Sequence, residues 1–364
     1  MTHIFSLELS VNFSYCLLMQ EADFYKRLGD NVVQCTLCPH NCRIKDGEFG
    51  TCAVRQNQAG ILYSLVYERA ISTNVDPIEK KPFFHVYPGS PSFSIATVGC
   101  NFICRFCQNH EISQMPRTGF IEGRKCTAGE IVDMAKRAHC KTIACTYTEP
   151  TIYFEYAYDI ARFAAEKEIL TLFVSNGFTN AKPIEKIAPY LAAANIDLKG
   201  WDEDFYKNVC GGSLKSVLNT LKLMKKLGIF VEVTTLVVPG YVDNEITLTD
   251  IAKFIANDLG VETPWHISRF FPHYRYHSKA LTSPEILGRA REIGKQQGLR
   301  YVYLGNIRDA EGESTFCYSC GEKLISRNGY MIKYNKIIDN KCPVCGAKID
   351  GINMDGAVDN WRIL

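Results

Sequence analysis

The sequence has no long run of one charge sign and no long apolar run. Its 41 Lys and Arg residues nearly balance 39 Asp and Glu residues, so nothing indicates a nucleic-acid partner or an anionic membrane surface. No stretch approaches the roughly 18 apolar residues of a membrane-spanning helix. Polar residues, among them Glu8 and Asn12, interrupt the start, which also lacks a basic region, so a signal peptide is not expected. We therefore expect a cytoplasmic protein, with residues 1–20 as an N-terminal extension.

The composition is that of a folded chain rich in cysteine. Hydrophobic residues make up 46% of the 364 positions, which is ample for a core. Sixteen cysteines without an export signal indicate metal binding rather than disulfides. Eleven of them form three clusters, which supports that interpretation. The other five are expected to be small core or neutral surface residues: Cys16, Cys126, Cys140, Cys145 and Cys210.

The central cluster has only three cysteines. Cys100, Cys104 and Cys107 follow an apolar, strand-like run over residues 94–98, so we place them on the loop that leaves a strand. A structural zinc ion is held by four ligands, and so is an iron–sulfur cluster bound only by protein. Three thiolates leave one metal position open to a substrate. The alternatives are small buried side chains, or a zinc ion completed by another ligand such as His110.

The C-terminal cluster repeats one pattern, C-x₂-C-G-x-K followed by an aliphatic residue. Glycine after the second cysteine permits the left-handed turn of a zinc knuckle. Two such pairs separated by 21 residues predict a zinc ribbon, against a rubredoxin-like iron site or two disulfides. The four expected zinc ligands are Cys317, Cys320, Cys342 and Cys345.

The N-terminal cluster places four cysteines in an 18-residue window that is rich in loop-forming residues. Such spacing is rare by chance and predicts a second metal site. The pattern does not choose between zinc and an auxiliary iron–sulfur cluster, and His40 could replace one thiol. The expected ligands are Cys35, Cys38, Cys42 and Cys52.

From residue 93 onward, apolar runs of strand length alternate with helix-like segments. This pattern predicts right-handed β-α-β units around a parallel sheet. The expected strands are residues 93–98, 142–146, 170–175, 194–198, 229–237, 264–270 and 300–304. The expected helices are residues 128–138, 151–168, 183–193, 213–227, 248–259 and 283–297.

Polar residues occur where these strands end, which is where parallel barrels carry their active sites. Glu149 follows the second strand and could simply cap the helix that Pro150 begins. Ser175 and Asn176 follow the third strand, although Asn-Gly is also a common turn. Asp197 and Lys199 end the fourth strand on one face, where an exposed ion pair is the alternative.

The C-x₃-C-x₂-C motif, with Phe106 before its last cysteine, resembles the signature of radical S-adenosylmethionine (SAM) enzymes. The resemblance implies an α/β fold with a partial (β/α)₆ TIM-like barrel. It implies a [4Fe-4S] cluster on Cys100, Cys104 and Cys107, with SAM on the open iron as the source of a 5′-deoxyadenosyl radical. It also places six residues in the SAM pocket: Phe106, Glu149, Ser175, Asn176, Asp197 and Lys199.

The segments 147–150, 175–178, 195–199 and 237–244 resemble the activating-enzyme branch, near pyruvate formate-lyase activating enzyme. The terminal cysteine patterns are similar to those of the radical enzyme of the AmmeMemoRadiSam system. That resemblance implies Memo-like and AMMECR-like protein partners, and an electron donor such as flavodoxin or ferredoxin. Residues 270–274 match less well, because His273 and its aromatic neighbour are exchanged.

These observations predict a Cys-rich metal-binding segment at residues 21–90, a barrel at residues 91–308 and a zinc-ribbon-like module at residues 309–364. The expected function is hydrogen abstraction from a partner-associated substrate by a radical SAM oxidoreductase. One alternative is an activating enzyme for a glycyl-radical enzyme. The other is a non-catalytic zinc-binding scaffold, which the open three-cysteine motif disfavours.

Overall fold

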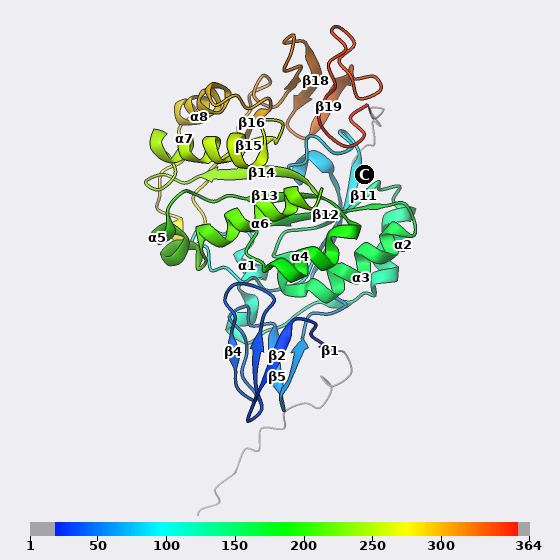
Figure 1. Ribbon diagram of the computed structural model, residues 1–364, viewed down its shortest axis with the longest axis vertical. Helices are drawn as coiled ribbons and strands as arrows, with labels where there is room; N and C mark the ends of the chain where they lie inside the picture. The colour runs from blue at the N-terminus through cyan, green and yellow to red at the C-terminus, as the bar shows by residue number, and fades with distance from the viewer. Residues whose placement is uncertain (1–18, 356–364) are drawn as a thin grey trace, which may run out of the picture.

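A curved eight-stranded sheet forms the centre of the molecule (Figure 1). The computed structural model describes residues 19–355. Seven strands run parallel in chain order, and β8 pairs antiparallel with β9 at one edge. Because β8 and β16 are opposite edges, the barrel is open, as expected for a partial (β/α) barrel. The strands are β8 (Ser72–Pro77), β9 (Pro91–Ala96), β11 (Thr142–Cys145), β12 (Leu170–Ser175), β13 (Leu191–Asp197), β14 (Phe230–Val237), β15 (Trp265–Arg269) and β16 (Val302–Gly305).

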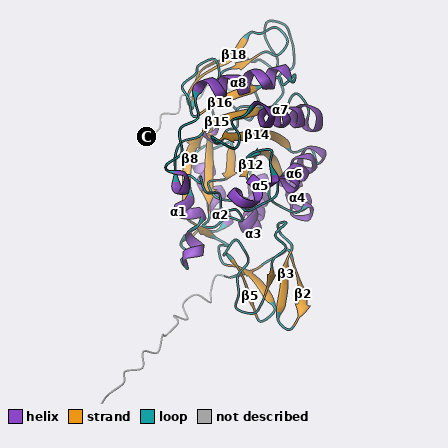
Figure 2. Cartoon of the chain, turned by 90° about the vertical axis from the view of Figure 1, so that its left-hand side faces the viewer, coloured by secondary structure: helices purple, strands orange, loops and turns teal. Residues whose placement is uncertain are grey.

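Helices connect the parallel strands, and α4, α6 and α7 lie along one side of the sheet (Figure 2). Capping residues set where several of these helices begin. Thr127 and Glu130 form a capping box at the start of α2, and Ser283 caps α8 directly before Pro284. Within residues 19–355, no helix has the length and apolar character needed to cross a membrane. The main helices are α2 (Ala128–Arg137), α3 (Phe154–Ala165), α4 (Ala181–Ile187), α6 (Leu214–Lys226), α7 (Glu245–Phe254) and α8 (Pro284–Gln296).

One expectation about these elements was wrong, and one strand was not expected. The helix expected over residues 183–193 ends at Ile187, and a 3₁₀ turn, η5 (Ala188–Tyr190), follows. Pro189 has no N–H to continue an α-helix, so the chain leaves the helix there and β13 begins at Leu191. The strand β8 was not expected. It lies within the range assigned to the Cys-rich segment but belongs to the large sheet.

The N-terminal part of the chain forms two small antiparallel sheets at the opposite end of the molecule from the C-terminal module (Figures 1 and 2). These strands were not expected, because the segment is rich in loop-forming residues. Its strands are β1 (Gln20–Glu21), β2 (Tyr25–Gly29), β3 (Val32–Cys35), β4 (Arg43–Ile44), β5 (Arg55–Gln58) and β6 (Ile61–Ser64). A further two-stranded pair joins β7 (Arg69–Ala70) to β10 (Arg124–Lys125). Residues 1–18, most of the expected extension, lie outside the described residues.

The C-terminal module packs onto the barrel through its own small core. Its sheet consists of β17 (Thr315–Phe316), β18 (Lys323–Asn328) and β19 (Met331–Asn335). Leu324 and Ile325 of β18 share a buried cluster with Tyr301 and Tyr303, which lie at the last barrel strand. The module is therefore attached to the sheet by a continuous apolar contact. Residues 356–364 of the range expected for it lie outside the described residues.

Candidate active site

The three central cysteines lie on the loop between β9 and α1 (His110–Ser113), as the sequence predicts. Two backbone hydrogen bonds fix this loop: Ile103 N donates to Cys210 O (2.7 Å) and Arg105 N donates to Val209 O (3.2 Å). The loop also requires glycine at residue 99, which has a φ of +103°. A Cβ there would lie 2.8 Å from Val54 Cγ1. Contacts with residues 209–210 and with Val54 therefore hold the loop in place.

All three thiols line one cavity of about 690 Å³. Burial raises the pKa of Cys100 and Cys107, while a contact with the Cys210 thiol, together with burial, raises the pKa of Cys104. Thiols in such surroundings stay neutral unless a bound cationic centre stabilises their thiolates. Three thiols on one loop beside a cavity fit an iron–sulfur cluster with one accessible iron.

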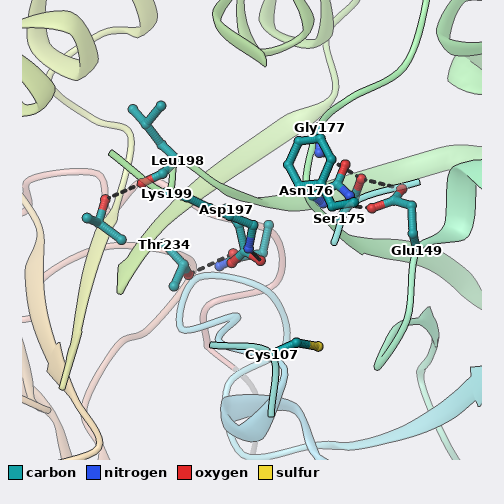
Figure 3. A network of polar contacts seen from close by, with 12 residues as sticks. Cys107, Glu149, Ser175, Asn176, Gly177, Asp197, Leu198, Lys199 and Thr234 are labelled. Carbon is teal, nitrogen blue, oxygen red and sulfur yellow. Dashed lines mark hydrogen bonds and ion pairs between the residues drawn. The ribbon is translucent and has the colours of Figure 1, made fainter. Parts of the chain in front are cut away.

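Glu149, Ser175 and Asn176 are brought together beside this loop. The Glu149 carboxylate accepts hydrogen bonds from Ser175 Oγ and Asn176 N, both at 2.8 Å (Figure 3). It also accepts from Thr151 N at 3.0 Å and thereby caps η4 (Pro150–Tyr153). The helix-cap role considered from the sequence is therefore present, and Glu149 additionally holds the turn after β12. The side-chain amide of Asn176 lies 3.7 Å from Cys100 Sγ.

Asp197 and Lys199 form a partly buried ion pair of 2.8 Å at the end of β13 (Figure 3). Burial opposes the charge on Lys199, but Asp197 and the neighbouring thiols hold its pKa above its usual value. Its ammonium group also lies 6.0 Å from the centre of the Phe106 ring. Phe106 is buried and stacks parallel to Phe205. Each of the six residues expected in the SAM pocket lines the cavity that contains the three thiols.

The sequence is similar to those of known proteins. Residues 94–255 match the radical SAM superfamily. A Methanocaldococcus jannaschii protein named "Putative glycyl-radical enzyme activating enzyme" is 31% identical over 61% of this chain and 89% of its own length. The chain belongs to the radical SAM superfamily. It is also similar to pyruvate formate-lyase-activating enzyme of Clostridium pasteurianum, with 24% identity over 46% of this chain and 72% of that protein.

The similarity to another relative extends well beyond the radical SAM domain. An uncharacterised protein of M. jannaschii is 46% identical over 334 residues, which is 91% of this chain and 99% of the relative. Such a match includes residues at both ends of the barrel. The similarity therefore extends past the barrel on both sides.

The C-terminal cysteines form a compact group in this radical SAM protein. Their four sulfur atoms lie within 4.8 Å of one another. Cys317 and Cys345 are separated by 3.6 Å, and Cys320 and Cys342 by 3.7 Å. A tetrahedron with zinc–sulfur bonds of about 2.3 Å has edges of about 3.8 Å, so the observed separations are compatible with one bound metal ion.

The N-terminal cysteines are held near the radical SAM loop but are less compact. Within residues 19–355, the C-terminal cysteines are the one group of three or more potential ligands whose atoms all lie within 4.8 Å of one another, so both the N-terminal and the central cysteines are more widely spaced. A metal at Cys35, Cys38, Cys42 and Cys52 therefore stays a prediction. Arg117 connects the two regions, because its guanidinium donates to Thr51 O (2.8 Å) and to Cys100 O (3.1 Å).

Several residues of the cavity were missed by sequence analysis. His266 of β15 lines the cavity, and its Nε2 lies 2.5 Å from the buried Glu232 carboxylate. The sequence did contain a signal for this pair, because Glu232 and His266 are polar residues within otherwise apolar strand segments. Glu79, Glu313 and Tyr330 also line the cavity, the last two from the C-terminal part of the chain. No sequence motif marks them, because only tertiary packing brings them there.

Two of the histidines considered from the sequence, His110 and His273, lie together. The His110 ring stacks on Tyr274 at a centroid distance of 4.3 Å and contacts the His273 ring at 5.2 Å. These ring contacts account for the positions of His110 and His273 without a metal ion. A zinc ion completed by His110 is not needed to explain the cysteine loop in a radical SAM protein.

Proposed function

We propose that the protein cleaves SAM reductively and abstracts a hydrogen atom from a substrate associated with a partner protein. The observation that carries the proposal is that the three-cysteine loop shares one cavity with Glu149, Asn176 and the Asp197–Lys199 pair. Cys100, Cys104 and Cys107 would hold the [4Fe-4S] cluster. When bound, the cluster supplies the electron that cleaves SAM into methionine and a 5′-deoxyadenosyl radical.

The remaining residues of the cavity would bind and orient SAM. Asn176 lies beside Cys100, and Glu149 holds the backbone of the Asn176 turn in place. Asp197 and Lys199 present opposite charges at the end of β13, which suits a ligand with both ammonium and carboxylate groups. Phe106 adds an aromatic wall. These roles are supported by the shared cavity and by the superfamily to which the chain belongs.

The test is anaerobic reconstitution followed by reduction with dithionite. We expect a cluster whose electron paramagnetic resonance spectrum changes when SAM is added, together with formation of 5′-deoxyadenosine. Cys104→Ala should abolish both. Cys140→Ala is the matched control, because Cys140 is also buried but lies outside the cavity. Formation of 5′-deoxyadenosine by a Cys100, Cys104 and Cys107 triple alanine variant would refute the proposal.

A second candidate is an activating enzyme that forms a glycyl radical on a partner enzyme. The names of two relatives, a putative glycyl-radical enzyme activating enzyme and a pyruvate formate-lyase-activating enzyme, favour it. Incubation with a deuterated cell extract distinguishes the candidates. Deuterium transfer from one large polypeptide, with a stable glycyl radical, would support activation. Deuterium transfer from a small-molecule fraction, without a protein radical, would support the first proposal, with a small molecule as the partner-associated substrate.

Further parts of the proposal concern partners and metals. An electron donor such as flavodoxin or ferredoxin would reduce the cluster, and Memo-like and AMMECR-like proteins are the proposed partners. We also propose zinc at the C-terminal cysteines, and zinc or an auxiliary iron–sulfur cluster at the N-terminal ones. Iron and zinc analysis of the reconstituted protein tests the metals. About four irons and two zincs per chain would support zinc at both ends.

A further inference from the structure

The four N-terminal cysteines are brought together by a small sheet and its loops. Cys35 ends β3, Cys38 and Cys42 lie between β3 and β4, and Cys52 lies between β4 and β5. Cys35 N donates a hydrogen bond to Cys42 O at 3.0 Å, and Thr51 N donates to Cys42 Sγ at 3.4 Å. The backbone therefore holds the segments that carry these cysteines side by side.

The spacing of their sulfur atoms differs from that of the C-terminal cysteines. All four belong to the described part of the chain, yet no three of them have sulfur atoms that all lie within 4.8 Å of one another. The three cysteines of the central loop are also spaced more widely than that. One zinc ion holds its sulfur ligands about 3.8 Å apart, whereas a cubane cluster binds each cysteine through a different iron atom and holds the sulfurs farther apart. The N-terminal spacing therefore favours the kind of centre expected at the central loop.

Arg55 of β5 has unused hydrogen-bond donors beside these cysteines. It is only 1% exposed, and its Nη2 pairs with the Glu155 carboxylate. Its Nε and Nη1 have no hydrogen-bond partner within residues 19–355. Burial raises the pKa of the Cys35 and Cys52 thiols, and the positive charge of Arg55 opposes both shifts, so its guanidinium lies near both thiols. Buried donors without acceptors are costly, and the sulfur atoms of a bound cluster would accept their hydrogen bonds.

Two hydrogen-bonded connections join this region to the central cysteine loop. His40 lies between two of the N-terminal cysteines, and its Nε2 is 2.8 Å from Asn101 O. The Arg117 guanidinium bridges Thr51 O (2.8 Å) and Cys100 O (3.1 Å). Each connection starts within two residues of an N-terminal cysteine and ends at Cys100 or at the residue after it. Clusters bound at the two sets of cysteines would therefore be neighbours.

We propose that Cys35, Cys38, Cys42 and Cys52 hold a second [4Fe-4S] cluster, which supplies electrons to the cluster that cleaves SAM. The inference rests on the proposed function and deepens it, since it selects iron over zinc at this site and gives the site a role. The reduced second cluster loses one electron, the oxidised SAM cluster gains that electron, and each electron gained permits cleavage of one SAM molecule. Arg55 donates hydrogen bonds to the sulfur atoms of the second cluster.

The first experiment measures metals and electron paramagnetic resonance spectra after anaerobic reconstitution. The triple alanine variant of the central cysteines should still hold about four irons per chain, with a spectrum after dithionite reduction that SAM does not change. In the otherwise native chain, the double variant Cys35→Ala and Cys38→Ala should lower the iron from about eight to about four per chain, whereas Cys140→Ala should not. An iron-free triple variant, or a double variant that loses zinc rather than iron, overturns the second cluster. If the triple variant does not fold, the double variant decides.

The second experiment counts electrons. The native holoenzyme and the Cys35→Ala and Cys38→Ala double variant are reduced with dithionite, separated from it by gel filtration and mixed with SAM. Because each 5′-deoxyadenosine requires one electron, we expect about two per chain from the native protein and about one from the double variant. The same yield per chain from both proteins overturns the electron supply. No 5′-deoxyadenosine from either protein overturns the proposed function instead, and the iron content still decides whether the second cluster exists.

Discussion

The barrel loop and the C-terminal module both gather cysteines, but they do so in different ways. The module brings four sulfur atoms within 4.8 Å, at the surface, where Cys320 and Cys345 are exposed. The barrel loop offers three thiols that line a cavity together with polar residues from three other strand ends. The first arrangement is compatible with one enclosed ion that would stabilise a fold, whereas the second leaves room for a ligand. Substitutions in the two regions should therefore have different consequences.

The largest expected effect is loss of iron and catalysis from the barrel loop. Cys107→Ala should abolish 5′-deoxyadenosine formation and remove the cluster, because two thiolates on the loop cannot replace three. Cys320→Ala should instead lower the zinc content by about one ion per chain and keep SAM cleavage. Metal analysis beside product assays measures both. Loss of iron and cleavage in folded Cys320→Ala would contradict the division between the two regions.

The next effect concerns the stability of the module. Structural zinc contributes on the order of 10 kcal/mol of apparent binding energy in small zinc modules. Removal of zinc by a chelator should therefore create a separate, lower calorimetric transition for the module while the barrel transition is retained. Cys342→Ser should reproduce that transition without a chelator, and Cys140→Ser should not. An unchanged melting profile after verified zinc loss would show that packing alone maintains the module.

The same two regions show what the sequence could and could not predict. The parallel strands were predictable because buried strands appear as continuous apolar runs, and the cysteine motifs have diagnostic spacing. The strand β8 was not, since Ser72–Pro77 is mostly polar and pairs only at the sheet edge. Glu79 and Tyr330 could not be linked from the sequence, because the docking of the module creates their shared wall.

A third prediction compares the module with the N-terminal sheets, where a buried ion pair adds to the apolar contact with the barrel. Arg55 of β5 forms a buried ion pair with Glu155 of α3, with Nη2 2.6 Å from Oε2. Removal of one partner from such a pair costs about 3–5 kcal/mol, so Arg55→Met should lower the free energy of unfolding by that amount. The half-exposed Lys186–Asp23 pair is the control, where Lys186→Met should cost less than about 1 kcal/mol. Equal costs in urea denaturation would refute this account.

The smallest effect concerns how the stability of the junction between the module and the barrel depends on pH. His85 lies in that junction, with Nδ1 2.5 Å from Asp350 O and Nε2 2.6 Å from the Tyr303 hydroxyl. Burial lowers its pKa from 6.5 to about 4. The folded protein therefore binds fewer protons than the unfolded chain between these values. Neutral His85 makes its full contribution to the free energy of unfolding above pH 6.5, and this contribution is lost as the pH falls towards 4.

A shift from 6.5 to about 4 corresponds to at most about 3 kcal/mol, at 1.36 kcal/mol per pKa unit. Acid also weakens thiolate–zinc binding, so the total slope of stability against pH contains both effects. The informative quantity is the difference in slope between the native protein and His85→Gln, measured by urea denaturation from pH 7 to pH 4.5. His85→Gln should remove the histidine contribution and leave the zinc contribution, whereas a substitution of the exposed His277 should change neither. Identical slopes for the native protein and His85→Gln would show that the junction tolerates a charged His85, and its burial would then have no role in the pH dependence.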